Sequence, residues 1–488
     1  MAEMTNVSTK KPNKFVLWLQ SIGDAFVNFF KKIGKFFVGI WQIMREGNWK
    51  TRLSFLIMGF GCFMYNQPLR GALYLLLEVG FILFMFFSGS YYLGKFGTLG
   101  TEVQGPIYND DGLQIGTSEG DNSLIILLFG VVTILLIFVF AFAYYKQLKN
   151  AFENQQRSEF GFPIESTKDD LRQMLNKNFH VTMLAAPTIG IVCFTIIPLI
   201  FMILIAFTNY DKSHLTPAQL FTWVGFENFK SLFSFNGTSS MGGTFLKLLG
   251  WTLLWAVLAT ITTYIGGMVL AILINKKGVR FKKIYRGFFV ITIAVPQFVS
   301  LLVVAKFFST EGGLVNQLLM SWGWIDKNIR WLEDANLARL MVVIINMWIG
   351  IPYSMLITSG ILMNIPEDLY ESARIDGAGP ITQFFKITLP YMLFVTGPYL
   401  LTQFIGNINN FNVIFLLTGG GPTSPDLMAP AGKTDLLITW LYDITVSGNY
   451  MDYKTGSVIG ILVFIVSAIL SLAVYGRTSS VKNEEDFQ

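Results

Sequence analysis

Residues 370–390, YESARIDGAGPITQFFKITLP, form a polar segment between two long apolar runs, Leu340–Met363 and Tyr391–Leu417. Each run is long enough to cross a bilayer, which takes roughly 20 residues, so the polar segment is expected to be a loop on one side of a membrane. The whole chain agrees, because 52% of its 488 residues are hydrophobic and only 14% are charged. Soluble proteins average about 25% charged residues. The sequence therefore indicates an integral membrane protein.

Two short helices are predicted in this loop. Pro366 suits the first turn of a helix, and Glu367 and Asp368 suit its positive N-terminal end. This helix should end near the Asp376-Gly377 turn, since glycine tolerates the left-handed backbone that ends helices. A second short helix should then lead into the next apolar run. On this pattern alone, an amphipathic connector on the bilayer surface explains the loop as well as a functional contact does.

Eight segments are long enough to span the membrane. They are residues 71–89, 123–145, 180–208, 247–275, 287–308, 337–363, 389–417 and 455–475. Loops 146–179 and 276–286 are rich in lysine and arginine, whereas loop 90–122 is acidic. By the positive-inside rule, the N-terminus, both basic loops, the loop at 364–390 and the C-terminal tail are cytoplasmic. The expected fold is an all-α integral membrane protein, a polytopic helical bundle of about eight transmembrane helices.

Residues 1–70 form a basic N-terminal region in which aromatic side chains are interleaved with lysines. We expect an amphipathic helix on the cytoplasmic leaflet; a mobile tail with some helical content is the alternative. No small-residue cleavage site follows the short apolar stretches, which argues against a cleaved signal peptide. Residues 53–65 are apolar but too short to span, so they should be re-entrant or interfacial.

Polar, uncharged side chains gather on one face of the sixth and of the seventh predicted span. They are Asn346, Gly350 and Tyr353 in the sixth, and Gln403, Asn407 and Asn410 in the seventh. The spacing i, i+4, i+7 places each set on one side of a helix. Amides in hydrocarbon are costly unless paired, so these faces predict either hydrogen bonds between packed helices or the lining of a wet cavity. In a cavity, amides suit sugar hydroxyls and Tyr353 suits stacking on a sugar ring.

Ionisable side chains are scarce in the predicted spans. Glu78 is the main one, with an expected orienting or packing role, and Lys306 lies near a span end, where its stem can reach the interface. A secondary transporter working alone would need more buried ionisable groups and inverted repeats, so it is the weaker alternative. Cys62 and Cys193 lie in apolar segments and there are only two histidines, so neither a metal site nor a cofactor is indicated.

The loop also resembles the EAA loop of ABC importer permeases. Glu371-Ser372-Ala373 is followed by three residues, Gly377, nine residues and the sequence ITLP at 387–390. Only Ser372 departs from the family pattern, a small residue in place of another. The resemblance implies that loop 364–390 is the coupling helix that sits in a cleft of a cytoplasmic ATPase. The residues implied in ATPase coupling are Glu371, Ser372, Ala373, Asp376 and Gly377.

From about residue 178 onward, the chain resembles sugar importer permeases of the maltose/maltodextrin (MalF) type. The matching stretches include NMWIGIPY (346–353), GNINNFNVIFLLTGGGP (406–422) and PAGKTDLLITWLY (430–442). The resemblance implies an ABC type I importer permease core of six spans at 180–476, after two N-terminal spans and a basic loop at 71–179, and before a cytoplasmic tail at 477–488. It implies sugar contacts at Asn346, Ile349, Gly350, Tyr353, Gln403, Gly406, Asn407 and Asn410.

Two of these positions depart from the family pattern and leave the exact sugar open. The maltose permeases have a serine where Gln403 stands and an aromatic residue where Gly406 stands, so a stacking surface is lost. The resemblance implies maltose or maltodextrin as the cargo, with galacto-oligosaccharides or raffinose-type sugars as alternatives. Because the sugar is moved without chemical change, the chain is expected to be a transporter subunit and not an enzyme.

The resemblance also implies the partners. These are a second homologous permease, two copies of a cytoplasmic ABC ATPase, an extracellular sugar-binding lipoprotein, the oligosaccharide and membrane lipid, with no nucleic acid. Enteric permeases carry a bulky domain at the position of loop 209–246, and this loop is short. A short loop here is typical of the plasma membrane importers of Gram-positive bacteria. The Gly- and Pro-rich loop 418–435 should contact the docked binding protein or plug the cavity mouth; a plain surface turn is the alternative.

Overall fold

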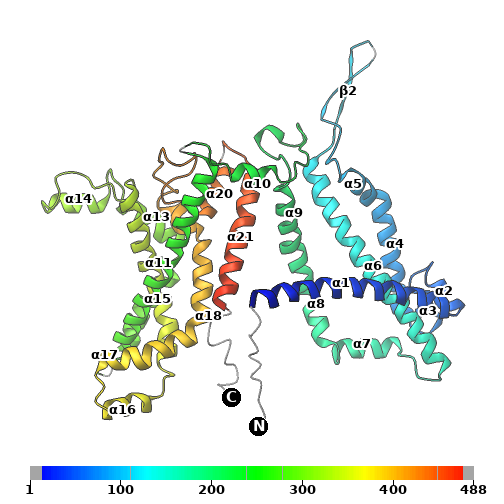
Figure 1. The fold of residues 1–488 in the computed structure, drawn as a ribbon, viewed down its shortest axis with the longest axis horizontal. Helices are drawn as coiled ribbons and strands as arrows, with labels where there is room; N and C mark the ends of the chain where they lie inside the picture. The colour runs from blue at the N-terminus through cyan, green and yellow to red at the C-terminus, as the bar shows by residue number, and fades with distance from the viewer. Residues whose placement is uncertain (1–13, 110, 238, 277, 448, 476–488) are drawn as a thin grey trace, which may run out of the picture. The chain divides into compact units, whose positions relative to one another are not determined.

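A computed structural model describes residues 14–109, 111–237, 239–276, 278–447 and 449–475. Apart from one antiparallel hairpin, β1 (Gly105–Tyr108) and β2 (Gln114–Ser118), its regular structure is helical (Figure 1). The helices are α1 (Lys14–Glu46), α2 (Trp49–Leu53), α3 (Phe60–Met64), α4 (Pro68–Phe84), η1 (Met85–Gly89), α5 (Ser90–Lys95), α6 (Ser123–Glu159), α7 (Thr167–Leu175), α8 (Phe179–Ile191), η2 (Val192–Ile196), α9 (Ile197–Ile205), η3 (Lys212–His214), α10 (Glu227–Leu232), α11 (Met241–Asn275), α12 (Lys282–Ala294), α13 (Gln297–Phe307), α14 (Leu314–Ser321), α15 (Ala335–Leu362), α16 (Glu367–Ile375), α17 (Pro380–Gln383), η4 (Phe384–Thr388), α18 (Leu389–Ile408), α19 (Phe411–Leu417), α20 (Leu437–Thr445) and α21 (Tyr453–Tyr475).

The chain divides into two compact units. The first comprises Met1–Glu102 and Gly120–Phe201, and the second comprises Val103–Glu119 and Met202–Gln488. The segment with the hairpin, Val103–Glu119, thus belongs to the second unit, and the last boundary between the units lies within α9, after Phe201. The predicted tail at 477–488 lies outside the described residues, and the predicted domain boundaries at 70 and 179 stay predictions.

Seven of the described helices are long and apolar enough to cross a membrane, which confirms the all-α polytopic fold. They are Pro68–Lys95, Ser123–Glu159, Phe179–Ile205, Met241–Asn275, Ala335–Leu362, Pro380–Ile408 and Tyr453–Ala473. An eighth crossing exists only if α12 and α13, which are bent by 89°, count as one span. The fifth predicted span, 287–308, is therefore not one straight helix but falls on this bent pair. Val295 is extended (ψ 126°), as is usual before proline, and Pro296 cannot donate a helical hydrogen bond.

The seventh predicted span, 389–417, is also interrupted. α18 ends at Ile408, and the side chain of Asn410 accepts a hydrogen bond from the backbone N–H of Val413 (3.4 Å) at the start of α19. Asparagine favours helix ends over helix interiors because its side chain competes for backbone hydrogen bonds. At its N-terminal end, α18 is continuous with η4 and α17, so the whole helix runs from Pro380 to Ile408.

The loop that precedes this helix contains the predicted first helix and its turn. α16 covers Glu367–Ile375, and Gly377 adopts a φ of +81° in the left-handed region. Pro366 is the N-cap residue and not part of the first turn, so it lies one position earlier than expected. The hydroxyls of Tyr370 and Thr388 are 2.8 Å apart and tie α16 to η4. The two short helices therefore form one connected support.

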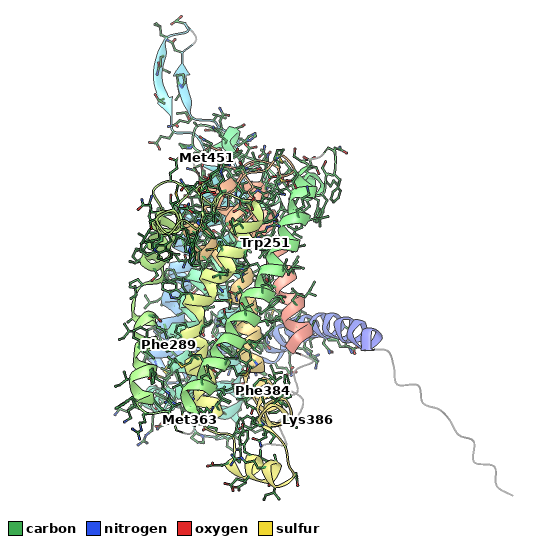
Figure 2. The ribbon with its side chains drawn as sticks, turned by 90° about the vertical axis from the view of Figure 1, so that its left-hand side faces the viewer. Trp251, Phe289, Met363, Phe384, Lys386 and Met451 are labelled. Atoms are coloured by element: carbon green, nitrogen blue, oxygen red, sulfur yellow. The ribbon has the colours of Figure 1, made fainter. Side chains whose placement is uncertain are left out.

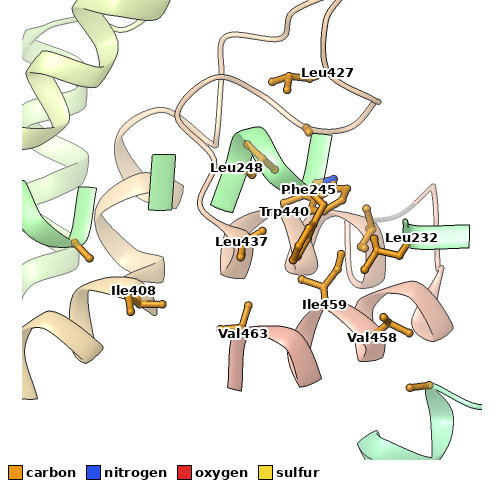
Figure 3. Close-up of a cluster of buried hydrophobic side chains, with 14 residues drawn as sticks. Leu232, Phe245, Leu248, Ile408, Leu427, Leu437, Trp440, Val458, Ile459 and Val463 are labelled. Carbon is orange, nitrogen blue, oxygen red and sulfur yellow. The ribbon is translucent and has the colours of Figure 1, made fainter. Parts of the chain in front are cut away.

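Close approach of α11 and α15 forms the centre of the second unit. A Cβ on Gly267 would lie 2.5 Å from the Cβ of Ser354, so only glycine permits this contact between the helix backbones. Figure 2 shows Trp251 near one end of the unit, and Met363 and Lys386 near the other. Beside these helices, a cluster around Trp440, which is 1% exposed, packs α20 and α21 against α11 (Figure 3).

The first unit contains the helix expected in the basic N-terminal region. α1 packs on α6, where the rings of Phe36 and Tyr145 lie 4.7 Å apart. A Cβ on Gly39 would lie 3.3 Å from the Tyr145 hydroxyl, so the two helices cross closely here. The position of α1 on a membrane surface stays a prediction, and residues 1–13 lie outside the described residues.

Residues 48–67 of the first unit form α2, α3 and a turn between them, packed against α6 rather than spanning. Side chains of α6 satisfy the irregular backbone: the Tyr144 hydroxyl donates to the Phe55 carbonyl (2.8 Å), and Gln147 Nε2 donates to the Ser54 carbonyl (2.8 Å). Non-helical backbone at membrane depth needs such partners because lipid offers none. The contacts therefore suit the predicted re-entrant or interfacial segment.

Glu78 on α4 supports the same segment. Its Oε2 accepts a hydrogen bond from the backbone N–H of Met58 (2.8 Å), and Met58 is 0% exposed. This contact agrees with the orienting role expected for Glu78.

Replacing Glu78 by leucine is expected to lower the free energy of unfolding by about 1–3 kcal/mol, because the buried N–H of Met58 loses its acceptor. Glu78→Gln is the matched control, since its amide oxygen still accepts. Thermal unfolding of the purified protein in detergent measures both. Equal losses in the two variants would show that the hydrogen bond is not what Glu78 contributes.

Candidate functional site

A cavity of about 160 Å³ lies in the second unit, between α11, α13, α15 and α18. Its lining consists of Ala259, Thr260, Thr263, Tyr264, Gln297, Asn346, Ile349, Gly350, Tyr399, Leu400, Gln403, Asn407 and Asn410. Most of these side chains carry an amide or a hydroxyl, and no acid, lysine or arginine is among them. The cavity therefore offers donors and acceptors to a neutral, hydroxylated ligand.

Six of the eight predicted sugar contacts line this cavity: Asn346, Ile349, Gly350, Gln403, Asn407 and Asn410. The other two lie outside the lining. Tyr353 is 49% exposed, and its ring centroid is 6.5 Å from that of the lining residue Tyr399. Gly406 is exposed, and a Cβ placed there would meet no atom within 4 Å. All eight sugar contacts stay predictions.

The α18 wall is a connected hydrogen-bond network. Asn407 Nδ2 donates to the hydroxyl oxygen of Thr260 (3.0 Å), and Asn410 Nδ2 donates to Asn407 Oδ1 (3.2 Å). Trp255 Nε1 donates to the carbonyl of Asn407 (3.1 Å), which fixes the backbone at the same point. Asn407 therefore forms a hydrogen bond between packed helices and also lines the cavity. The two roles considered for the polar faces are compatible at this residue.

The α15 wall is closer to its neighbour and more enclosed. Asn346 is 8% exposed, and its Nδ2 donates to the Thr263 hydroxyl at the long distance of 3.5 Å. A Cβ on Gly350 would lie 2.7 Å from Thr263 Cγ2. Glycine at 350 therefore lets the threonine-bearing face of α11 reach the cavity.

Five polar lining residues lie outside the set predicted from the sequence: Thr260, Thr263 and Tyr264 on α11, Gln297 at the start of α13, and Tyr399 on α18. The α11 residues follow the spacing i, i+3, i+4 and so share one face. Threonine and tyrosine are ordinary in apolar helices, which makes this a weak signal. Gln297 reaches the cavity because α13 starts directly after the bend at Pro296.

The residues predicted to couple to an ATPase lie together on α16 and its turn. Glu371, Ser372, Asp376 and Gly377 are exposed, and Ala373 is partly buried. α16 follows α15 and leads through α17 into α18. α15 and α18 are the helices that carry most of the predicted sugar contacts. A displacement of α16 would therefore act on both cavity walls.

Loop 418–435 is packed against the second unit and is not a free surface turn. The carboxylate of Asp435, 1% exposed, accepts hydrogen bonds from the Gly432 N–H (2.8 Å) and the Thr439 hydroxyl (2.7 Å). Burial raises the pKa of Asp435 to about 7, against the lowering effect of those two hydrogen bonds. Thr423 and Gly432 form an antiparallel bridge that closes the loop.

The stability of the protein is expected to fall by about 1 kcal/mol between pH 6 and pH 8 because of Asp435. In the unfolded chain this acid ionises near its ordinary pKa of 3.8, whereas the folded protein keeps the proton up to about pH 7. The stabilising contribution is thus complete only below about pH 3.8, and it is lost progressively as pH rises from there to the folded pKa of about 7. Asp435→Asn should remove this part of the pH dependence of thermal unfolding. An unchanged pH dependence in the variant would assign the effect to other groups.

Comparison with known proteins identifies one family. Residues 265–479 match the model described as "Binding-protein-dependent transport system inner membrane component". The chain is 33% identical over 432 residues to the galactooligosaccharides transport system permease protein GanP of Bacillus subtilis, covering 88% of this chain and 97% of that protein. It is 30% identical over 443 residues to the maltodextrin transport system permease protein MalC of Streptococcus pneumoniae, covering 89% and 97%.

Matches that cover a smaller share of the chain agree with this result. The maltose/maltodextrin transport system permease protein MalF of Escherichia coli is 36% identical over 265 residues, which cover 54% of this chain and 50% of that protein. Among solved structures, a bacterial ABC transporter involved in the import of the acidic polysaccharide alginate has the same fold. It superposes with a TM-score of 0.52 at 21% identity, covering 64% of this chain and 98% of that chain.

Proposed function

Because the chain belongs to the family of binding-protein-dependent transport system inner membrane components, we propose that it is the permease subunit of an ATP-driven importer for neutral oligosaccharides. As a member of this family it is a multi-pass inner membrane protein and a transporter component rather than an enzyme. The observation that carries the proposal is the cavity between α11, α15 and α18, whose lining is rich in amides and hydroxyls and free of charge.

Maltose or a maltodextrin is the cargo we propose first. Sugar hydroxyls donate and accept hydrogen bonds, as do the amides of Asn346, Gln403 and Asn407 in the lining. The relative from Streptococcus pneumoniae is named for maltodextrin transport. A phosphorylated cargo would require a lysine or arginine in the lining, and the cavity has neither.

A galacto-oligosaccharide is the second candidate, and a specific observation favours it. The relative named for galactooligosaccharides is 33% identical over 88% of this chain. Gln403 and Gly406 depart from the maltose permease pattern, and Gly406 has open space around it, so no aromatic ring occupies that position. We therefore expect the region around Gln403 and Gly406 to separate the two cargos.

The assembly we propose contains a second homologous permease, two copies of a cytoplasmic ABC ATPase and an extracellular sugar-binding lipoprotein. It would lie in the plasma membrane of a Gram-positive bacterium, with both termini in the cytoplasm. ATP-driven closure of the ATPases would move α16 through Glu371, Ser372, Ala373, Asp376 and Gly377. Because α16 connects the two cavity helices, this movement would switch the cavity between outward and inward access.

Uptake of labelled sugars tests the proposal. Cells that carry the full transport system should import maltotriose in an ATP-dependent manner, and cells without this chain should not. Parallel uptake of a galacto-oligosaccharide of equal length separates the two cargos. Import that continues without any ATPase partner would contradict the ABC assignment, and import of neither sugar would contradict the cargo class.

A further inference from the structure

A second hollow of the second unit, here called the outer groove, has a volume of about 390 Å³. α11, α15 and loop 418–435 contribute its lining, whose charged side chains are Lys247, Arg339, Asp426 and Lys433. Trp251 also lines it, near the end of the unit that is far from Met363 and Lys386 in Figure 2. Since α16 follows Met363, the outer groove and the proposed ATPase contact lie at opposite ends of the same helix, α15.

The outer groove has a surplus of positive charge. Lys247 and Lys433 pair with the carboxylate of Asp426 at distances of 3.1 and 2.8 Å. Hydrogen bonds from Lys433, Ser424 and Lys247 hold the pKa of Asp426 well below its usual range, so this acid is ionised at neutral pH. With Arg339, three cations therefore face one carboxylate. A neutral sugar does not need such a surplus.

Arg339 is held from two sides. Its Nε donates to the carbonyl of Lys433 (2.8 Å), and its guanidinium lies over the ring of Trp251, 4.4 Å from the centroid. Trp251 is 6% exposed, and its Nε1 donates to the carbonyl of Thr434 (3.1 Å), so the ring is itself fixed. Among the described residues, nothing forms a hydrogen bond with the two terminal guanidinium nitrogens. The arginine is thus positioned before any partner binds.

We propose that the outer groove receives an acidic side chain of the binding protein, an inference that rests on the proposed function. A fixed guanidinium forms two parallel hydrogen bonds with a carboxylate, which a lysine alone does not match. Preorganisation lowers the entropy cost of binding, and the positive groove steers an acidic partner toward it. Loop 418–435 lies outside the spanning helices and forms one wall, which favours a docking protein over a lipid headgroup.

The test measures ATPase activity of the complete transporter in nanodiscs while the system's own sugar-loaded binding protein is titrated. Lys247→Gln and Arg339→Gln are each expected to raise the half-saturating concentration of binding protein about tenfold, the effect of losing about 1.4 kcal/mol. Lys247→Glu should raise it further through repulsion. The maximal rate should approach that of the wild type, and the salt dependence of half-saturation should become weaker.

Lys212→Gln is the matched control, because this exposed lysine lies outside the lining and its ammonium donates, among the described residues, only to the Asn449 carbonyl (3.3 Å). The proposal is overturned if Lys247→Gln and Lys247→Glu leave half-saturation unchanged, or if the control shifts it equally. It is also overturned if the variants alter only the response to phosphatidylglycerol in the nanodisc, which would assign the groove to lipid. A wild-type complex that no binding protein stimulates would instead contradict the proposed function itself.

Discussion

Replacing Glu371 with lysine is expected to reduce ATP-driven uptake at least tenfold while the protein remains in the membrane. Glu371 is exposed in the middle of α16, Ile375 at the end of the same helix is 87% exposed, and Ile381 on α17 is 76% exposed. Such apolar exposure next to a charge is typical of a surface that a partner protein covers. A reversed charge within a protein contact costs several kcal/mol, which is more than enough for a tenfold loss.

The measurement is the initial rate of labelled sugar uptake, together with the amount of permease in the membrane. Glu311→Lys provides a matched charge reversal at another exposed acid, in the turn between α13 and α14, and should leave uptake unchanged. The purified complex should show reduced co-purification of the ATPase for Glu371→Lys alone. Normal uptake with Glu371→Lys would remove α16 from the coupling mechanism.

Asn407→Leu is expected to raise the KM for sugar uptake at least tenfold. The substitution keeps the number and branching of the side-chain heavy atoms but removes the hydrogen bonds to Thr260 and from Asn410. Leaving buried or half-buried partners unsatisfied costs about 1–3 kcal/mol, and the cavity loses an amide that could bind a hydroxyl. One lost hydrogen bond to a sugar at about 1.4 kcal/mol corresponds to a factor of ten.

The control for Asn407→Leu is Asn409→Leu, two residues along the chain. Asn409 is exposed and lies outside the cavity lining, and within the described part of the chain its side chain donates only to the carbonyl of Ile405 (3.3 Å). It should leave KM unchanged, so a difference between the two variants depends on position and not on the loss of an amide. Equal KM values for wild type and Asn407→Leu, at equal membrane levels, would show that the sugar does not pass this cavity.

Local chemistry explains why several features could be predicted from the sequence. The spans follow from long apolar runs, because backbone polar groups in lipid must be satisfied within a helix. The helix at 367–375 and its turn depend on local residues, with Pro366 at its start and Gly377, which adopts the expected φ of +81°, just past its end. The shared face of Asn346 and Gly350 follows from the helical period, and both residues line the cavity.

Tertiary packing decided what the chain pattern could not specify. Hydropathy does not report where a long apolar run bends. The hydropathy pattern therefore does not predict the 89° break before Gln297 or the end of α18 at Ile408. The face of α11 that carries Thr260 and Thr263 lines a cavity only because α11 packs beside α15 and α18.

The membrane class, the positions of most spans and the polar faces follow from the amino-acid sequence, since each depends on neighbours along the chain. Which polar side chains converge depends instead on how the folded helices pack. Tyr353 shares a helical face with Asn346 but lies outside the cavity lining, whereas Thr263 and Gln297, distant in sequence, lie within it. The physical reason is that convergence depends on close contacts such as Gly267 against Ser354, which join residues far apart in the chain.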